Sequence, residues 1–176
     1  MDAVAMSARF EHVVALERDE ILADVVRENM RRMGIENVEV ITTTAEEYVA
    51  ACEEHFDWVY ADPDRRTADG KRVVRLEDCS PNMVALYPAL GCITERVAIK
   101  NSPLFDVEEA FRLFGRCGVE VISHTDECKE VNIYIDGQGA RLAAEAVGRM
   151  RIEVKREEID NTPCQGEFMA GEYGYL

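Results

Sequence analysis

The sequence predicts an α/β protein with a doubly wound, mostly parallel sheet that ends in an antiparallel hairpin. Short apolar strands alternate with helices along most of the chain, and the connections between them are only a few residues long. Since a helix between two strands acts as a crossover, the joined strands run parallel with right-handed connections. Near residue 130, two strands follow each other with no helix between them, which predicts an antiparallel pair.

The composition predicts one globular domain with room for a small appendage. The chain has 176 residues, of which 47% are hydrophobic and 31% are charged, so it can form a sizeable core. Its formal net charge is −15, whereas general affinity for nucleic-acid backbones normally requires a basic surface. The charge therefore disfavours general binding to nucleic acids and leaves a local basic patch open.

The sequence predicts a cytoplasmic protein with reduced thiols. The apolar runs are short and interrupted, and the first residues lack a basic region followed by an apolar core, so neither a membrane span nor a secretory signal is expected. The cysteines form no Cys-x-x-Cys motif and no tight group with histidines, which predicts mostly buried free thiols and no metal site. The cysteines are Cys52, Cys79, Cys92, Cys117, Cys128 and Cys164.

The first part of the chain predicts helices and strands in alternation. Asp19 is the expected N-cap of the second helix and Gly34 follows its end, while Thr44 and Glu47 form a capping box that opens the third helix. Apolar positions at helical spacing predict a buried face on the second helix. These positions are Ile21, Leu22, Val25, Val26, Met30 and Met33. The expected strands cover residues 12–16, 38–41 and 56–61, and the expected helices cover residues 2–10, 20–33 and 45–52.

The second part predicts two further helices and the hairpin. Ser80 is the expected N-cap, and Pro81 the first residue, of a helix that ends at Leu90. Asp106 is the expected N-cap of a helix that ends near Gly118. The expected strands cover residues 96–99, 119–123, 131–135 and 152–155, and a further helix is expected over residues 141–150.

The segment from Phe56 to Arg66 carries the first candidate site. Its apolar half predicts a buried strand, which ends at Asp62 because Pro63 has no backbone N–H to donate to a sheet. In open α/β sheets, ligands bind beyond the carboxyl ends of the strands. Asp62 and Pro63 therefore indicate either a ligand-binding strand end or an ordinary Asp-Pro turn.

Two further strand ends carry candidate ligand residues. Glu17 follows the first strand, where a carboxylate can accept both hydroxyls of a nucleotide ribose; a solvated acid near a helix N-terminus explains it equally well. Thr44, Ala45 and Glu46 follow the second strand, where an adenine ring could lie. Helix capping is a sufficient explanation for this segment, so the ligand role is the weaker alternative.

Basic residues beside the Asp62 strand end are candidates for phosphate contacts. Five basic residues occur between Arg65 and Arg75, beginning with Arg65 and Arg66, and guanidinium groups match the geometry of phosphate. A solvated loop is the alternative. Lys100, at the end of a later strand, is either a contact to a ligand phosphate or carboxylate, or a surface lysine in a salt bridge.

Several segments together resemble a known family. The similar segments are residues 13–19 (Val-Val-Ala-Leu-Glu-Arg-Asp), 27–35, 60–66 (Tyr-Ala-Asp-Pro-Asp-Arg-Arg), 76–81 (Leu-Glu-Asp-Cys-Ser-Pro), 99–106 and 126–130 (Asp-Glu-Cys-Lys-Glu). They resemble class I S-adenosylmethionine-dependent methyltransferases that carry a THUMP-like C-terminal domain. The likeness runs from about residue 2 to about residue 136. An acid at a strand end and an Asp-Pro turn are generic, whereas the longer segments are more specific.

The resemblance implies a Rossmann-like methyltransferase sheet and a set of cofactor residues. Glu17, with its neighbour Arg18, would hold the ribose of S-adenosyl-L-methionine, and the strand end from Thr44 to Glu46 would lie near its adenine. Asp62 and Pro63 would lie beside the sulfonium, with Asp62 orienting or deprotonating the acceptor.

The resemblance also implies the acceptor class. RNA is the expected methyl acceptor by analogy with other THUMP-associated enzymes, with Arg65, Arg66 and Lys100 as its contacts. The related strand-end motif that methylates amino groups continues with Pro and an aromatic residue, whereas here Asp64 is followed by two arginines. This departure disfavours N-methylation of a base.

A second departure concerns the ends of the fold. The family begins with a strand and a glycine-rich loop that are expected before residue 1, so the first strand is expected to be missing and the chain to be truncated at both ends. Residues 1–139 would then form the methyltransferase core, and residues 140–176 a linker and the start of the THUMP-like domain. A non-catalytic binding or scaffold role is the alternative function. A nucleotide-binding oxidoreductase is disfavoured, because the sequence has no glycine fingerprint.

Overall fold

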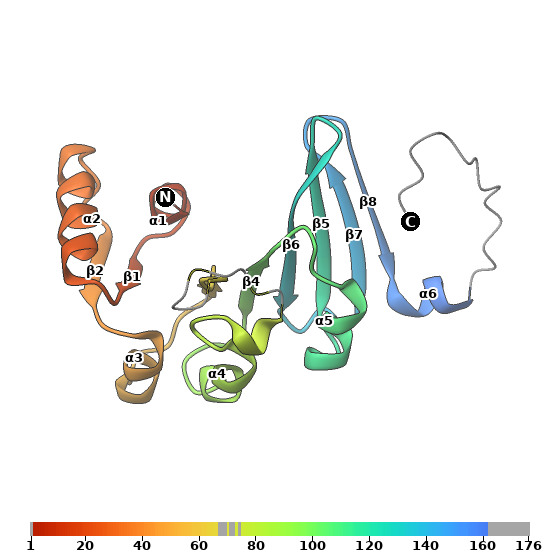
Figure 1. Ribbon diagram of the computed structural model, residues 1–176, viewed down its shortest axis with the longest axis horizontal. Helices are drawn as coiled ribbons and strands as arrows, with labels where there is room; N and C mark the ends of the chain where they lie inside the picture. Colours follow the sequence, from red (N-terminus) through yellow and green to blue (C-terminus); the bar gives the residue numbers. More distant parts are fainter. Residues whose placement is uncertain (1, 67–69, 71–72, 74, 162–176) are drawn as a thin grey trace. The chain divides into compact units, whose positions relative to one another are not determined.

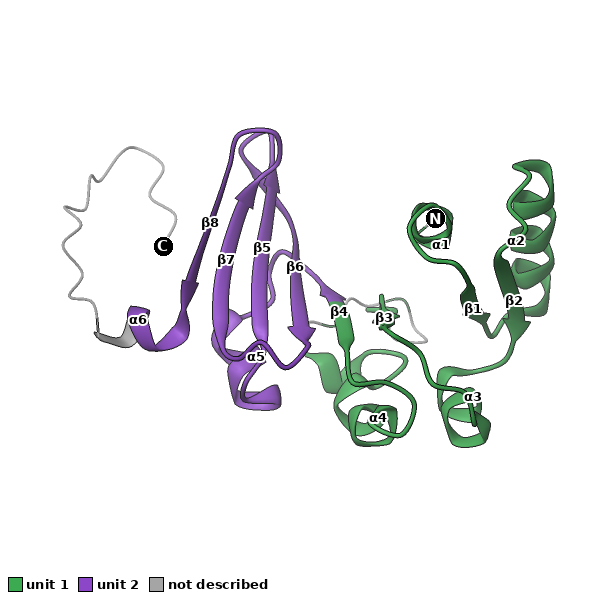
Figure 2. Cartoon of the chain, turned by 180° about the vertical axis from the view of Figure 1, so that it is seen from behind, with its two compact units in different colours: residues 1–99 green, residues 100–176 purple. Residues whose placement is uncertain are grey.

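The computed structural model describes residues 2–66, 70, 73 and 75–161. The chain divides into two compact units, Met1–Ile99 and Lys100–Leu176 (Figure 2). Helices and strands alternate as the sequence predicted, and the sheets combine parallel and antiparallel pairs. The predicted α/β class is therefore confirmed. The predicted domain boundary between residues 139 and 140 stays a prediction.

Unit 1 consists of alternating helices and parallel strands (Figure 1). Strand β1 pairs with β2, and β3 pairs with β4, in parallel register. In chain order its elements are α1 (Asp2–Ser7), β1 (Val13–Glu17), α2 (Glu20–Arg32), β2 (Val38–Thr42), α3 (Ala45–Ala51), β3 (Val59–Ala61), the 3-10 turn η1 (Leu76–Asp78), α4 (Met83–Leu90) and β4 (Val97–Asn101), whose last two residues cross the unit boundary.

In the described part of unit 1, β1 and β3 are not paired in one continuous sheet. Within the described residues, β1 belongs to a sheet of two strands and β3 to a different sheet. The Val13 N–H donates to the Asn37 carbonyl (2.9 Å), and the Thr43 N–H donates to the Glu17 carbonyl (3.1 Å). Since backbone groups alternate in direction along a parallel strand, those of Val14 and Leu16 point away from β2. The far edge of β1 is therefore open in the part of the chain that the structure describes.

Unit 2 is built on a mixed sheet with the strand order β6-β5-β7-β8 (Figure 1). Strands β5 and β6 form the predicted antiparallel hairpin, β7 pairs in parallel with β5, and β8 pairs antiparallel with β7. The elements are α5 (Val107–Phe114), β5 (Gly118–His124), β6 (Glu127–Ile135), β7 (Arg141–Ala146), β8 (Met150–Lys155) and α6 (Arg156–Asn161).

The predicted helix over residues 141–150 is wrong. Residues Arg141–Ala146 form β7, and Gly148, at φ 75°, turns the chain into β8. Leu142, Ala143 and Ala144 favour a helix locally, but pairing with β5 on one side and β8 on the other outweighs this preference. The deciding partner, β5, lies about twenty residues earlier in the chain, so a local pattern carries no sign of it.

The predicted buried face of α2 is also wrong in part. Its caps are as predicted, because Asp19 accepts the Leu22 N–H (3.0 Å) and Gly34 has a φ of 66°. Met30 and Ala23 are buried, whereas four of the apolar residues that were predicted to be buried are at least 50% exposed. These are Ile21, Leu22, Val25 and Met33. A sheet of two strands is too narrow to cover the whole apolar face of a 13-residue helix.

The well-buried core of unit 1 lies around α4 and β4. Leu76, Met83, Leu90 and Ile99 are almost completely buried, and in unit 2 the residues Val119, Val131 and Ile133 are buried similarly. In contrast, every residue of β1 and β3 is only half-buried. The strand predicted as buried over residues 56–61 is therefore shorter, Val59–Ala61, and less covered than expected, consistent with the interruption beside it.

The cysteines agree with the prediction of free thiols but not with that of general burial. The five described cysteines are all free. Cys79 and Cys117 are buried, and burial raises the pKa of Cys117 to about 11. Cys92 and Cys128 are exposed, and Cys164 lies outside the described residues. No helix within the described ranges is both long and apolar enough to cross a membrane.

A buried ion pair in unit 2 leads to a stability prediction. Arg141 donates from Nη1 and Nη2 to the two carboxylate oxygens of Asp136 (3.0 and 2.8 Å), and the two side chains are 15% and 4% exposed. Burial acts to raise the pKa of Asp136, but the hydrogen bonds from Arg141 and from the Gln138 N–H outweigh it and lower that pKa. We expect Asp136→Asn to lower the free energy of unfolding at pH 7 by about 3 kcal/mol, because the largely buried Arg141 loses its two-pronged partner and keeps only Glu153, whose Oε1 lies 4.0 Å from its Nε.

Chemical denaturation of both proteins across pH checks this expectation. Because the folded-state pKa is lowered, the contribution of Asp136 is present above the ordinary aspartate pKa of about 3.9 and is lost as the pH falls through the folded-state value. The difference between wild type and variant should thus shrink in acid. Asp126→Asn is the matched control, since its surface pair with Arg149 should contribute less than about 1 kcal/mol. Equal effects of the two substitutions would contradict the prediction.

Candidate functional site

The candidate site of unit 1 lies at the carboxyl ends of its strands. In each parallel pair, both strands end at the same edge. Glu17 ends β1, Thr44 follows β2, and Asp62 follows β3. The strand ends are therefore positioned by backbone pairing, and the side chains beyond them are ordered by turns and helix caps.

Glu17 is fixed at the start of α2. It is the last residue of β1 and is half-buried, and its Oε1 accepts the Asp19 N–H at 2.9 Å. Asp19 in turn caps α2 through the Leu22 N–H. The Glu17 carboxylate thus lies beside a helix N-terminus, where the helix dipole favours a negative charge. Both alternatives from the sequence are compatible with this geometry, so the ribose contact stays a prediction.

The turn after β3 is tied to the segment around Ser80. Asp62 is exposed and Pro63 is buried. The Asp64 N–H donates to the Ser80 carbonyl (2.7 Å), and the Ser80 N–H donates to the Asp64 carbonyl (3.0 Å), which forms an isolated antiparallel bridge. We call residues 62–64 together with this bridge the Asp-Pro turn. A cis peptide bond joins Ser80 to Pro81.

The predicted N-cap at Ser80 is wrong. The helix α4 begins at Met83, and its N-cap is Asn82, whose Oδ1 accepts the Ala85 N–H at 3.0 Å. The backbone of Ser80 is engaged in the bridge with Asp64, so the residue lies outside the helix. A Ser-Pro pair is a good local helix start, and only the distant partner of Ser80 excludes it.

Arg18 joins the end of β1 to the Asp-Pro turn. Its Nη1 donates to the Ser80 Oγ at 3.0 Å, and its Nη2 lies 3.9 Å from the Asp64 Oδ2. The structure therefore brings Arg18, the neighbour of Glu17, to the turn that contains Asp62 and Pro63. It adds Ser80, which sequence analysis assigned to a helix cap. The only sequence signal for Ser80 was its place in the Leu-Glu-Asp-Cys-Ser-Pro segment.

The segment from Thr44 to Glu46 forms the predicted capping box. The Glu47 N–H donates to the Thr44 Oγ1 (3.2 Å), and the Thr44 N–H donates to the Glu47 Oε2 (3.3 Å). That backbone hydrogen bond is the main cause of a lowered pKa at Glu47. Ala45 and Glu46 form the first turn of α3. The capping role is confirmed, and the adenine contact stays a prediction.

The basic candidates are separated between the two units. Arg65 is half-buried, and Arg66 is exposed, with its N–H donating to the Asp64 Oδ1 at 3.1 Å. Of the other basic residues of this loop, Lys71 and Arg72 lie outside the described residues, whereas Arg75 is exposed and its Nη2 lies 3.4 Å from the Glu77 Oε1.

Lys100 belongs to unit 2 and is the fourth residue of β4 rather than a residue beyond the strand end. Its Nζ lies 3.9 Å from the Glu130 Oε2, as expected for the salt-bridge alternative.

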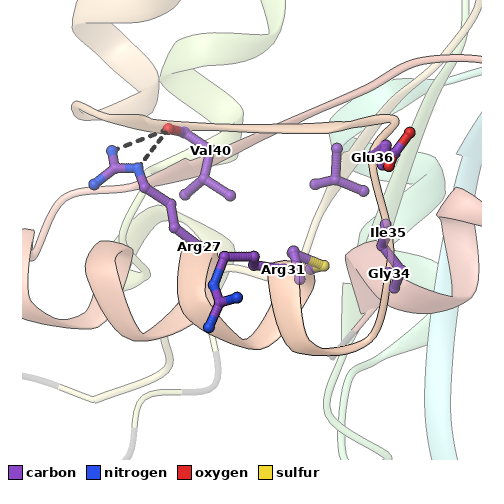
Figure 3. Close-up of a pocket in the computed structure, with 8 residues that line it drawn as sticks. Arg27, Arg31, Gly34, Ile35, Glu36 and Val40 are labelled. Atoms are coloured by element: carbon purple, nitrogen blue, oxygen red, sulfur yellow. Dashed lines mark hydrogen bonds between the residues drawn. The ribbon is translucent and has the colours of Figure 1, made fainter.

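A pocket of about 310 Å³ lies elsewhere in unit 1, between the C-terminal half of α2 and β2 (Figure 3). Arg27 donates from Nε and Nη2 to the Val40 carbonyl (3.2 and 3.0 Å) along one side of this pocket. None of the residues that line it belongs to the predicted site. In the described ranges, no group of three or more His, Cys, Asp and Glu side chains could hold a metal ion.

Comparison with known proteins establishes the fold. No protein-family model and no curated protein matches the sequence. The structure resembles that of a protein named "putative methyltransferase" from Porphyromonas gingivalis W83, with a TM-score of 0.78 at 21% identity over 92% of this chain and 43% of that one. It also resembles an rRNA methylase from Streptococcus thermophilus, with a TM-score of 0.52 at 12% identity over 77% of this chain and 78% of that one.

The chain therefore has the fold of these methyltransferase structures. At such low identities the likeness concerns the fold, and activity and substrate are separate questions. This chain spans less than half the length of the Porphyromonas protein. Membership of the THUMP-like family and truncation stay predictions.

The capping box at the second strand end leads to a prediction. Thr44→Ala removes the oxygen that accepts the Glu47 N–H and is expected to lower the free energy of unfolding by about 1 kcal/mol. Thr44→Ser retains a hydroxyl at the same position and should restore most of that loss. Chemical denaturation of the three proteins measures both effects. A Ser variant as unstable as the Ala variant would show that the methyl group of Thr44, rather than its cap, stabilises this strand end.

Proposed function

We propose that the strand ends of unit 1 form the cofactor site of an S-adenosylmethionine-dependent methyltransferase. The observation that carries the proposal is the contact of Arg18 with Ser80 and Asp64, which joins the end of β1 to the Asp-Pro turn in a chain with a methyltransferase fold. A strand-end acid and an Asp-Pro turn, each at the carboxyl end of a parallel strand, agree with the place where α/β proteins bind nucleotides.

Each candidate residue has a proposed role. Glu17 accepts hydrogen bonds from the ribose hydroxyls, with its carboxylate oriented by the Asp19 N–H. The backbone from Thr44 to Glu46 borders the adenine. Asp62 is exposed beyond β3, where its carboxylate can orient an acceptor group or take its proton, and the buried ring of Pro63 fixes the direction of the turn. S-adenosyl-L-methionine, when bound, supplies an electrophilic methyl group.

RNA is the proposed acceptor. Arg65 and Arg66 follow the Asp-Pro turn directly and provide guanidinium groups for phosphate. The fold neighbour from Streptococcus thermophilus is named as an rRNA methylase. With a net charge of −15, contact with RNA would be local. Lys100 is a further proposed phosphate contact, although Glu130 competes for its ammonium group.

A non-catalytic role is the second candidate function. The observation that favours it is the interruption between β1 and β3, because an open strand edge beside the candidate site exposes backbone groups that a continuous sheet would pair. In this case the chain keeps the methyltransferase fold as a binding or scaffold module. The assignment of residues 140–176 to a linker and the start of a THUMP-like domain is a separate proposal, and residues 162–176 lie outside the described residues.

Calorimetric titration with S-adenosylhomocysteine tests the cofactor site. We expect saturable binding by the 176-residue chain and an affinity about 10- to 150-fold lower in Glu17→Ala, the range for losing hydrogen bonds to a charged group. Glu36→Ala is the matched control, since Glu36 is an exposed glutamate before β2, away from the strand ends. It should bind as the wild type does.

The outcomes separate the two candidate functions. A folded chain that releases no heat supports the non-catalytic role. Binding that Glu17→Ala and Glu36→Ala leave equally unchanged would place the ligand away from the β1 strand end and contradict the proposed site.

Charge reversal tests the proposed RNA contact. Replacing Arg65 and Arg66 by Glu is expected to weaken binding of a single-stranded RNA and to reduce the slope of log affinity against log salt by about 0.7 for each phosphate that is no longer neutralised. The control is the same reversal at Arg31 and Arg32, two exposed arginines on α2. Electrophoretic mobility or anisotropy titrations at several salt concentrations provide the measurement. An equal loss of affinity in both double variants would indicate that only net charge matters.

A further inference from the structure

We infer that Arg18 is a positioning residue: it holds the Asp-Pro turn at the end of β1 and acts on the ligand through this turn, without contacting the ligand itself. We call the contacts of Arg18 with Ser80 and Asp64 the latch. The expected effect on cofactor binding rests on the proposed function. The latch itself is inferred only from contacts within unit 1.

The latch consists of two contacts from one guanidinium. Arg18 Nη1 donates to the Ser80 Oγ at 3.0 Å, and Nη2 lies 3.9 Å from the Asp64 Oδ2. Its two targets are already joined, since the backbones of Asp64 and Ser80 exchange hydrogen bonds of 2.7 and 3.0 Å. A single side chain therefore contacts both sides of the bridge that closes the turn.

The interruption of the strands gives this latch its importance. In a continuous parallel sheet, backbone hydrogen bonds would set the separation of neighbouring strand ends. Here β1 and β3 belong to different sheets within the described residues, so such bonds are replaced by side-chain contacts. A second side-chain contact links β3 to the segment before β1: the Tyr60 hydroxyl on β3 donates to the Asp2 carboxylate on α1 (2.8 Å). Arg18 is the contact at the carboxyl end, where the candidate site lies.

Because the Arg18 contacts are exposed, they can position the turn without contributing much to the free energy of unfolding. The side chains of Arg18 and Asp64 are 60% and 51% exposed, and ion pairs with this exposure contribute little to folding. An Arg18 variant should therefore fold normally, with its effect confined to the turn. Since its Nη1 donates to Ser80 and its Nη2 lies 3.9 Å from Asp64, Arg18 is proposed to act through the turn in place of the direct ligand contact that the sequence predicted.

Amide exchange in the free protein tests the latch without any ligand. We expect Arg18→Gln to raise the exchange rates of the Asp64 and Ser80 amides about two- to fivefold, the range for an exposed ion pair, with the melting temperature unchanged. The Ala23 amide of α2, bonded to the Asp19 carbonyl, should exchange as before. Arg32→Gln is the control, because it removes a similarly exposed arginine paired with Glu28. Unchanged exchange at Asp64 and Ser80 in Arg18→Gln would overturn the latch.

A double-mutant cycle on S-adenosylhomocysteine affinity tests the positioning role. We expect Arg18→Gln and Ser80→Ala each to weaken binding by about the same two- to fivefold factor, and the double variant to lose no more than either single one. Fully additive losses would mean that Arg18 contacts the ligand directly and would overturn the inference. If the wild type binds no ligand, the proposed function fails while the exchange measurement still decides whether the latch exists.

Discussion

Parallel pairing of β1 with β2 and of β3 with β4 is the constraint on which the candidate site depends. In a parallel pair, the carboxyl ends of both strands lie at one edge, so residues far apart in sequence leave the sheet together. Glu17 and the start of α2 occupy one such end, the Thr44 capping box the next, and Asp62 the end of β3. Each polar group is then oriented locally, by a cap or a turn, at a place that the strand pairing has selected.

The Asp-Pro turn shows how a second, longer-range contact refines this arrangement. Strand β3 ends at Ala61, and the bridge between Asp64 and Ser80 sets the direction of the chain beyond it. Because of this bridge, Ser80 lies outside α4, and its hydroxyl accepts a hydrogen bond from Arg18. A backbone interaction thus creates the acceptor for a side-chain interaction, and together they connect the two separate strand pairs of unit 1.

Burial is distributed unevenly in relation to the candidate site. The closely packed residues of unit 1 surround α4 and β4, whereas β1 and β3, which carry Glu17 and precede Asp62, are half-buried throughout. Ligand-binding segments are commonly drawn from the less stable parts of a protein. In unit 2, by contrast, the Asp136 and Arg141 side chains form a largely buried ion pair that has no part in the proposed chemistry.

Short-range chemistry in the sequence by itself determined three of the helix starts and the order of elements as far as the hairpin of β5 and β6. The caps at Asp19, Thr44 and Asp106 depend on a partner two or three residues away, and the alternation of helix and strand predicted the parallel pairs and the hairpin. The tertiary structure decided the rest: that residues 141–146 form a strand beside β5, that Ser80 pairs with Asp64, and that Arg18 reaches Ser80 across 62 positions of sequence. In each case the deciding partner is distant in sequence, and no local pattern contains it.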